Sequence, residues 1–199
     1  MSAERIVDFP PKHFSFPQGR VGIRRLEAED REAFLAATQE SAELHGRWIQ
    51  PPLDKASFDV LLEKTSQPNF VAWVVTEIQT FEIVGMVHLS QLILGPFQNA
   101  FLSYWAHQSF SGRGFMTEAL RLALHSSFGE LGLHRLEANI QPENAASIAL
   151  VKHLGFVKEG FSEKYLQILG EWKDHERWAI HAEIWPERRL DRDDLPRWS

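Results

Sequence analysis

The sequence contains no cysteine. This absence excludes disulfide bonds, thiolate metal sites and a covalent thiol intermediate. Histidine is frequent, with nine residues, but the sequence has no HExxH motif and no tight cluster of metal ligands. His175 and His181 share one strand face at best. We therefore expect no bound metal ion.

Long apolar runs are also missing. The run "FVAWVV" is far shorter than the ~20 apolar residues of a membrane span. The first residues, "MSAERIVDFPPKHF", carry charges and prolines where a secretory signal needs an uninterrupted apolar core. These two features predict a cytoplasmic protein without a membrane partner.

Basic residues are fewer than acidic ones, and the formal net charge at pH 7 is −6. A sequence-independent grip on nucleic acid uses clustered Lys and Arg, so we expect no direct nucleic-acid partner. An acidic surface instead attracts cationic partners such as amines and basic peptides.

The 199 residues suffice for one domain of ordinary size. We expect an N-terminal arm over 1–20, a single domain over 21–186 and a C-terminal tail over 187–199. Hydrophobic periodicity and turn residues predict a mixed α/β fold. The expected helices are 31–44, 54–65, one that ends at 128, and 144–154. The expected strands are 21–26, 70–77, 82–93, 99–106, 134–140 and terminal strands near 156–161, 164–169 and 177–185.

The stretch "SFSGRGFMTEAL" places two glycines around Arg113, directly before a predicted helix. Glycines let backbone amides turn inward, and a helix start adds unpaired N–H groups, so an anion can bind there. The guanidinium of Arg113 is suited to phosphate. An ordinary glycine-containing turn is the alternative interpretation.

Other phosphate loops fit this stretch poorly. The P-loop pattern G-x-x-x-x-G-K-[ST] is absent. A dinucleotide fingerprint needs glycine or alanine at the position of Thr117 and an acidic residue about 20 positions on, and Glu137 fits that place poorly. The stretch also lies in the middle of the chain, behind antiparallel strands.

A second motif, "LHRLEANIQPENAASIALVKHLGF", predicts a strand followed by a helix. Within the strand, Leu136 and Ala138 face one way, whereas Glu137 faces the other. Asn144 is a favourable N-cap for the helix, and Gly155 ends it.

Three segments carry a resemblance to a known family: "GRGFMTEAL", "RLEANIQPENAASIALVKHLGF" and "EGFSEKYLQILGEWKDH". Over about 21–186 the chain resembles the GCN5-related N-acetyltransferase (GNAT) family, and within it the RimJ-type and RimL-type ribosomal-protein N-terminal acetyltransferases. The resemblance implies a mixed, mostly antiparallel twisted sheet of about six or seven strands flanked by about four helices. It also implies acetyl-CoA as co-substrate.

The resemblance assigns the glycine turn to the pyrophosphate of acetyl-CoA. The backbone of the "SYWA" strand would meet the oxyanion, and Asn144 would cap a helix beside the coenzyme. Ser111 departs from the Arg or Gln that is usual before the first glycine, for which we expect a modest loss of affinity or none. The implied coenzyme-binding residues are Trp105, Ala106, Gly112, Arg113, Gly114, Phe115, Met116, Thr117, Asn144 and Ser147.

Acetyl transfer to an amine needs a neutral nucleophile and a proton for the leaving thiolate. Glu137 is the first candidate base, with Glu159 as a substitute; a solvated strand glutamate is the alternative. The resemblance places Ser147 beside the coenzyme sulfur, although its hydroxyl also suits a helix start. Tyr165 is a second candidate proton donor or a core residue.

The acceptor amine is less well specified by the sequence. The resemblance places Trp48, Asp174 and His175 near it, although Trp48 also suits a core. An N-terminal α-amine, of a ribosomal protein with Ala or Ser first, is the leading acceptor. The alternatives are a small amine (a polyamine, an amino-acid-like toxin or an antibiotic) and a non-catalytic module that senses acetyl-CoA. Without cysteine, direct attack in a ternary complex is expected. Related enzymes are often dimers, so a homodimer is one expected assembly.

Overall fold

The structure is a computed structural model that describes residues 14–16, 18–185 and 197–198. The predicted arm and tail lie largely outside these residues, and the domain limits stay predictions. The described helices are α1 (Arg31–Glu40), α2 (Ala42–His45), α3 (Lys55–Lys64), α4 (Phe115–Gly129) and α5 (Ala145–His153). The strands are β1 (Phe14–Ser15), β2 (Val21–Arg25), β3 (Val71–Glu77), β4 (Ile83–Ile93), β5 (Asn99–Ala106), β6 (Arg135–Ile140), β7 (Val157–Ile168), β8 (Glu171–His181) and β9 (Arg197–Trp198).

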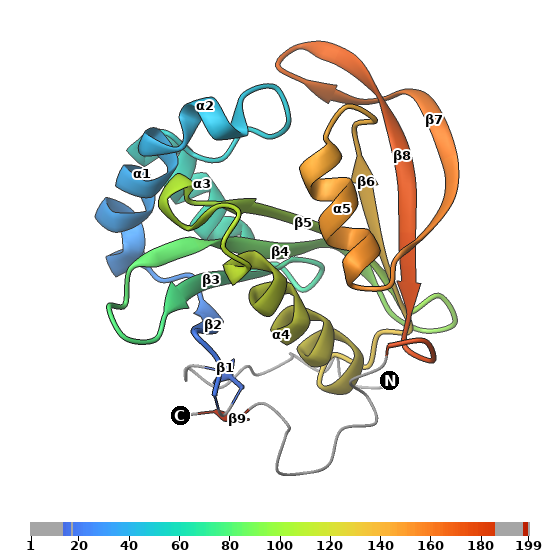
Figure 1. Ribbon diagram of the computed structural model, residues 1–199, viewed down its shortest axis with the longest axis horizontal. Coiled ribbons are helices and arrows are strands. Elements are labelled where there is room, and N and C mark those ends of the chain that lie inside the picture. The colour runs from blue at the N-terminus through green and yellow to red at the C-terminus, as the bar shows by residue number, and fades with distance from the viewer. Residues whose placement is uncertain (1–13, 17, 186–196, 199) are drawn as a thin grey trace.

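The strands form one mixed sheet in the order β7-β8-β6-β5-β4-β3-β2-β1-β9 (Figure 1). Only β5 and β6 pair in parallel among the described strands. The predicted mixed α/β class and mostly antiparallel sheet are confirmed. The predicted strand number was too low, because β1 and β9 are two residues long and such pieces carry no hydrophobic period.

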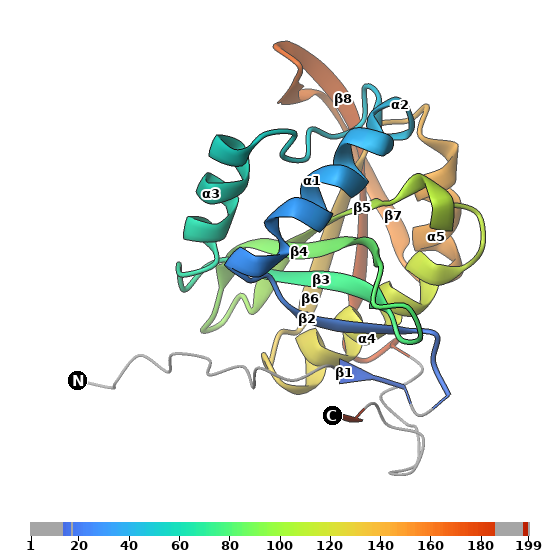
Figure 2. The same ribbon diagram turned by 90° about the vertical axis from the view of Figure 1, so that its left-hand side faces the viewer.

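Helices cover both faces of the sheet (Figure 2). On one face, Phe34 of α1 and Phe58 of α3 pack on Val74, Met86 and Trp105. On the other face, α4 and α5 pack over the apolar side of β6, where Leu136, Ala138 and Ile140 are buried as the alternation predicts. None of the described helices is both long and apolar enough to cross a membrane.

The first predicted helix, 31–44, is interrupted at Ser41. The Ser41 hydroxyl is buried, donates to the Ala37 carbonyl at 2.7 Å and accepts from the Gln108 backbone N–H at 2.9 Å. This second bond ties the end of α1 to the segment after β5. A contact 67 residues away along the chain therefore divides the helix into α1 and α2.

The segments 156–161 and 164–169 form one strand, β7, where the sequence predicted two. The pairing of β7 with β8 shifts register between Ser162 and Leu166, and Lys164 has φ +45°. The Asp174 carboxylate accepts a hydrogen bond from the Lys164 backbone N–H at 2.8 Å. This contact stabilises the irregularity, so the hairpin continues through a stretch that reads as a break in sequence.

Burial also keeps one histidine neutral. His88 of β4 stacks on Phe70, with 5.3 Å between ring centroids. Burial, with a smaller effect of the Lys64 charge, lowers the pKa of His88 to about 4. An unfolded histidine titrates at about 6.5, so between pH 6.5 and 4 the unfolded chain binds more protons than the folded one. This difference lowers the free energy of unfolding as the pH falls.

Replacing His88 tests this conclusion. Protonation of His88 in the unfolded chain should lower the free energy of unfolding by about 2 kcal/mol between pH 7 and pH 5. In His88→Gln this share of the pH dependence should be absent. Urea unfolding of both proteins at the two pH values measures it. An equal pH dependence in His88→Gln and the wild type would contradict the assignment.

Candidate active site

The candidate site lies where β5 and β6 separate. The two strands form three register pairs, from Asn99↔Arg135 to Phe101↔Glu137. Beyond Phe101, β5 pairs with β4, and beyond Glu137, β6 pairs with β8. Each strand therefore turns one backbone edge toward the other without joining it. Such edges offer N–H and C=O groups to an extended ligand that carries amides.

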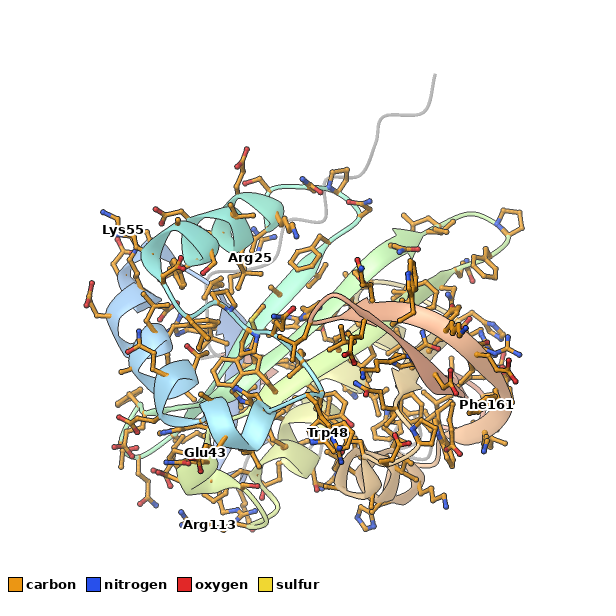
Figure 3. The ribbon with its side chains drawn as sticks, turned by 90° about the horizontal axis from the view of Figure 1, so that it is seen from above. Arg25, Glu43, Trp48, Lys55, Arg113 and Phe161 are labelled. Carbon is orange, nitrogen blue, oxygen red and sulfur yellow. The ribbon has the colours of Figure 1, made fainter. Side chains whose placement is uncertain are left out.

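A cavity of about 600 Å³ occupies this opening. It reaches from the glycine turn, across the parted strands, to α2 and the β7–β8 hairpin. In the view from above, Trp48 lies well inside the outline of the molecule and Arg113 at its margin (Figure 3). The predicted site residues that line the cavity are Trp48, Trp105, Ala106, Gly112, Gly114, Met116, Thr117, Asn144, Ser147 and His175.

The glycine turn leads directly into α4. Gly114 is the N-cap residue, with φ +82° and ψ −1°. Glycine adopts this conformation without strain, whereas residues with a Cβ are strained in it. Gly112 has φ +71°, and a Cβ there would meet nothing within 4 Å. The first N–H groups of α4 have no partners within the helix, so the turn fits a pyrophosphate.

Arg20 holds this turn in place, a role that the sequence did not reveal. Its Nε donates to Glu118 Oε1 at 2.6 Å and its backbone N–H to Glu118 Oε2 at 2.9 Å. Its Nη1 donates to the Arg113 carbonyl at 3.2 Å, and the guanidinium lies 4.3 Å from the centroid of the Phe115 ring. Arg20 thus joins the start of β2 to the first turn of α4.

Arg113 and Phe115 lie beside the turn, outside the lining of the cavity. Arg113 Nη1 donates to the Ser109 carbonyl at 3.0 Å, and its guanidinium lies 5.0 Å from the centroid of the Phe115 ring. Phe115 is buried. The Phe115 ring thus contacts the guanidinium groups of both Arg20 and Arg113, and phosphate binding by Arg113 stays a prediction.

Two hydroxyl groups line the cavity beside α5. As the sequence predicts, Asn144 caps this helix: its Oδ1 accepts from the Ser147 backbone N–H at 3.1 Å. The Tyr104 hydroxyl donates to the Ser147 carbonyl at 3.5 Å, and burial raises the pKa of Tyr104 to about 12. Tyr104 therefore carries its proton at neutral pH. Sequence analysis missed it, because only the fold brings β5 beside α5.

Glu137 and Tyr165 are not among the lining residues. The Glu137 carboxylate accepts a hydrogen bond from Arg135 Nε at 3.1 Å, and the same guanidinium forms an ion pair with Glu159. This guanidinium lowers the pKa of the Glu159 carboxyl. The Tyr165 ring lies against His175, with 6.1 Å between centroids. The structure thus does not bring these three candidates to the cavity, and their catalytic roles stay predictions.

The end of the cavity away from the glycine turn is lined by residues of α2, β8 and the end of β6. Gln141, which sequence analysis did not select, donates from Nε2 to the Arg47 carbonyl at 3.0 Å and thereby fixes the segment that carries Trp48. His175 is buried, and burial lowers its pKa. Its Nδ1 lies 2.9 Å from the Lys173 carbonyl, which can only accept, so the lone pair is on Nε2. Asp174 lies outside the lining and instead holds β7.

The described lining of the cavity contains few titratable side chains. No Asp, Glu, Lys or Arg occurs among the described lining residues. The titratable nitrogen groups there are His45, His153 and His175. Within the part of the chain that the structure describes, no group of three or more His, Cys, Asp or Glu side chains is arranged to hold a metal ion.

Parallel strands that separate, with a glycine turn at a helix N-terminus beside them, are typical of the GNAT class of N-acetyltransferases, which use acetyl-CoA. The model of the acetyltransferase (GNAT) domain family matches residues 20–157. The chain is 32% identical over 169 residues to the probable N-acetyltransferase YjcK of Bacillus subtilis, a match that covers 79% of this chain and 92% of that protein. The chain therefore belongs to the GNAT family of N-acetyltransferases.

Other relatives share the fold or part of the sequence. The [ribosomal protein uS5]-alanine N-acetyltransferase of Escherichia coli is 38% identical over 104 residues, 52% of this chain and 54% of that protein. Mycobacterium smegmatis RimJ, in complex with CoA-disulfide, superposes with a TM-score of 0.77 at 27% identity and covers 94% of this chain and 95% of its own. Spermidine N-acetyltransferase of Vibrio cholerae, at 23% identity and a TM-score of 0.72 over 83% of this chain and 98% of its own, shares the fold.

The glycine turn yields a direct test. Gly114→Val places a branched side chain at a positive φ in the turn where we expect the pyrophosphate, so the Kd for CoA should rise at least about 100-fold. Isothermal titration calorimetry measures it. Gly132→Val is the control for a branched side chain at a positive φ, because Gly132 has φ +64° and does not line the cavity. At Gly114 the added Cβ would also lie 3.3 Å from Arg20 Nη2, whereas at Gly132 it would meet nothing within 4 Å. Equal affinities in Gly114→Val and the control would place the pyrophosphate elsewhere.

Proposed function

We propose that this acetyltransferase acetylates the N-terminal α-amine of a protein, by direct attack of the amine on acetyl-CoA in a ternary complex. The observation that supports this acceptor is the absence of charged side chains other than histidine among the described lining residues. A cation that enters such a cavity loses its hydration without gaining an ionic partner.

The pKa of the acceptor amine decides how much free energy is needed to bring the amine into this cavity in its neutral form. An α-amine has an unperturbed pKa of about 7.7–8.0, so removing its proton at pH 7 costs about 1.4 kcal/mol. For an alkyl amine with the pKa of Lys, about 10.4, the same deprotonation costs about 4.6 kcal/mol. An uncharged cavity therefore favours the α-amine by about 3 kcal/mol without a strong base.

A polyamine is the second candidate, supported by the net charge of −6 that attracts cations to the surface. It carries further ammonium groups, each of which needs a carboxylate once it is desolvated. The cavity supplies no carboxylate among its described lining residues. This difference makes the protein N-terminus the better acceptor.

The chain's own groups divide the proton transfers between the two ends of the cavity. Acetyl-CoA supplies the activated acetyl group when bound. Ser147, or Tyr104 beside it, provides the proton for the departing thiolate. His175, neutral because its pKa is lowered by burial, presents Nε2 to the acceptor amine. Trp48 forms the wall past which the acceptor enters.

The relatives narrow the acceptor further, within this proposal. The E. coli relative is named for the alanine terminus of ribosomal protein uS5, so a terminus that begins with Ala or Ser is the first choice. We also place the reaction in the cytoplasm, and leave the homodimer as a state to be measured by light scattering.

The acceptor class is tested by free-thiol release with acetyl-CoA. We expect turnover of short peptides that begin with Ala or Ser, and at least about 100-fold lower kcat/KM for spermidine. Higher kcat/KM for spermidine would remove the protein N-terminus as the acceptor. Binding of acetyl-CoA without turnover of any peptide or amine would favour the non-catalytic alternative.

The proton donor is tested by removing hydroxyl groups singly. Ser147→Ala should lower kcat by about 10- to 100-fold at an unchanged KM for acetyl-CoA. Tyr104→Phe and Tyr165→Phe measure the two other candidate hydroxyls, of which Tyr104 lines the cavity and Tyr165 does not. Normal kcat in Ser147→Ala with a large loss in Tyr104→Phe would transfer the role to Tyr104.

A further inference from the structure

The end of β6 is tied to the segment that follows α2 by one side chain. Gln141 comes directly after β6, is 6% exposed and lines the cavity. Its Nε2 lies 3.0 Å from the Arg47 carbonyl oxygen and 3.5 Å from the Trp48 carbonyl oxygen. Carbonyl oxygens can only accept, so the amide nitrogen of Gln141 is the group that points to them. The side chain thus connects β6 with the segment that carries Trp48.

The backbone of Gln141 extends this connection toward the hydroxyl groups of the cavity. Its carbonyl accepts a hydrogen bond from the Asn144 N–H at 2.9 Å. Asn144 caps α5 by accepting from the Ser147 N–H, and the Ser147 carbonyl accepts from the Tyr104 hydroxyl of β5. A chain of hydrogen bonds therefore leads from Gln141 along the start of α5 to β5.

A second chain of hydrogen bonds leads from the same side chain to β5 through α2. The Trp48 N–H donates to the His45 carbonyl at 2.9 Å. His45 Nε2 lies 3.0 Å from the Ala106 carbonyl oxygen, which can only accept, so Nε2 carries the proton and donates. Since Tyr104 and Ala106 both belong to β5, the two chains close a hydrogen-bond ring. Its members other than Arg47 line the cavity.

Within this ring, the Gln141 amide controls the position of Trp48. The preceding Gly46 has φ +43° and ψ −120°, so α2 ends there and helical hydrogen bonds do not hold the segment after it. The Arg47 guanidinium lies 4.7 Å from the centroid of the Trp48 ring, so the two side chains move together. Removal of the amide would take the donor from both carbonyls. The segment would then shift to recover hydrogen bonds and carry Trp48 with it.

We propose that Gln141 is a positioning residue for the acceptor. It holds Trp48 at a fixed place relative to the hydroxyl groups of Ser147 and Tyr104, and it acts on the acceptor only through Trp48. Its backbone carbonyl supports the other side of the cavity through Asn144, and no substitution of the side chain removes that bond. The side chain therefore governs binding of the acceptor and leaves binding of the coenzyme unchanged. This inference rests on the proposed route of the acceptor past Trp48.

Gln141→Met tests this role, because methionine has a similar length but no N–H donor. The KM for a peptide that begins with Ala should rise about fivefold, the value of one neutral hydrogen bond. The Kd for CoA, measured by calorimetry, should equal that of the wild type. An unchanged KM for the peptide would overturn the proposal. So would a parallel loss of peptide and CoA binding, which a general disturbance of the fold would produce.

Gln39→Met is the control for the loss of a bond from glutamine to a backbone carbonyl. Gln39 Nε2 donates to the Leu53 carbonyl at 2.9 Å, in the same connection between α2 and α3 that carries Trp48. Gln39 is exposed and does not line the cavity, so its loss should leave the KM for the peptide unchanged. A rise equal to that in Gln141→Met would contradict a specific role of Gln141.

Gln141→Glu adds a pH profile, which a merely structural role would not change. The introduced carboxylate can only accept, whereas the protonated carboxyl can donate to one of the two carbonyls. Burial raises the pKa of a carboxyl, so the ratio of its kcat/KM for the peptide to that of the wild type should rise as the pH is lowered from about 9 to about 6. His45, His153 and His175 of the cavity lining, Arg47 and the acceptor amine are common to both proteins, so their titration cancels in the ratio.

The outcomes separate this inference from the proposed function. A ratio that stays constant with pH would overturn the positioning role, also where Gln141→Met fails to fold, and would leave the proposed function intact. A wild-type enzyme that acetylates spermidine but no peptide would overturn the protein N-terminal acceptor. The KM for spermidine in Gln141→Met would then decide the positioning role by the same criterion.

Discussion

The separation of two parallel strands is the constraint on which the site depends. Backbone N–H and C=O groups need partners, and β5 and β6 each obtain them on one side only beyond their third register pair. The antiparallel partners β4 and β8 hold both strands in place, so the opening between them is built into the sheet. A ligand with amides completes a pattern that the fold leaves unfinished.

The two faces of the sheet supply different chemistry to this opening. The α4 and α5 face provides helix N-terminal amides at Gly114 and hydroxyls at Tyr104 and Ser147, which suit an anion and a departing thiolate. The α1–α3 face provides a largely apolar wall that includes His45 and Trp105. The two faces therefore differ in polarity at the opening, and a ternary complex of the kind proposed needs such separate groups for its two reactants.

Sequence reasoning identified the features that depend on neighbouring residues and missed those that depend on contacts between distant parts of the chain. The glycine turn and the Asn144 cap follow from neighbouring residues, and the order of most helices and strands follows from periodicity. The break at Ser41 does not, because it depends on a distant backbone N–H. Glu137 faces the side that alternation predicts, but an ion pair with Arg135 occupies its carboxylate. Tyr104 has no sequence signal of its own, since its neighbour Ser147 is on a later helix.

The hydrogen bonds that Arg20 forms with Glu118 and the Arg113 carbonyl determine how far this enzyme can be truncated from its N-terminus. A chain shortened to begin at Val21 would keep the pairing of β2 with β3 but would lose β1, which pairs with the other edge of β2 and buries Phe14. It would lack the guanidinium that secures Glu118 and the Arg113 carbonyl, and the turn would be free to sample other arrangements. If the turn binds the coenzyme as proposed, the affinity measured on such a fragment would understate that of the longer chain, even where β2 to β8 still pair.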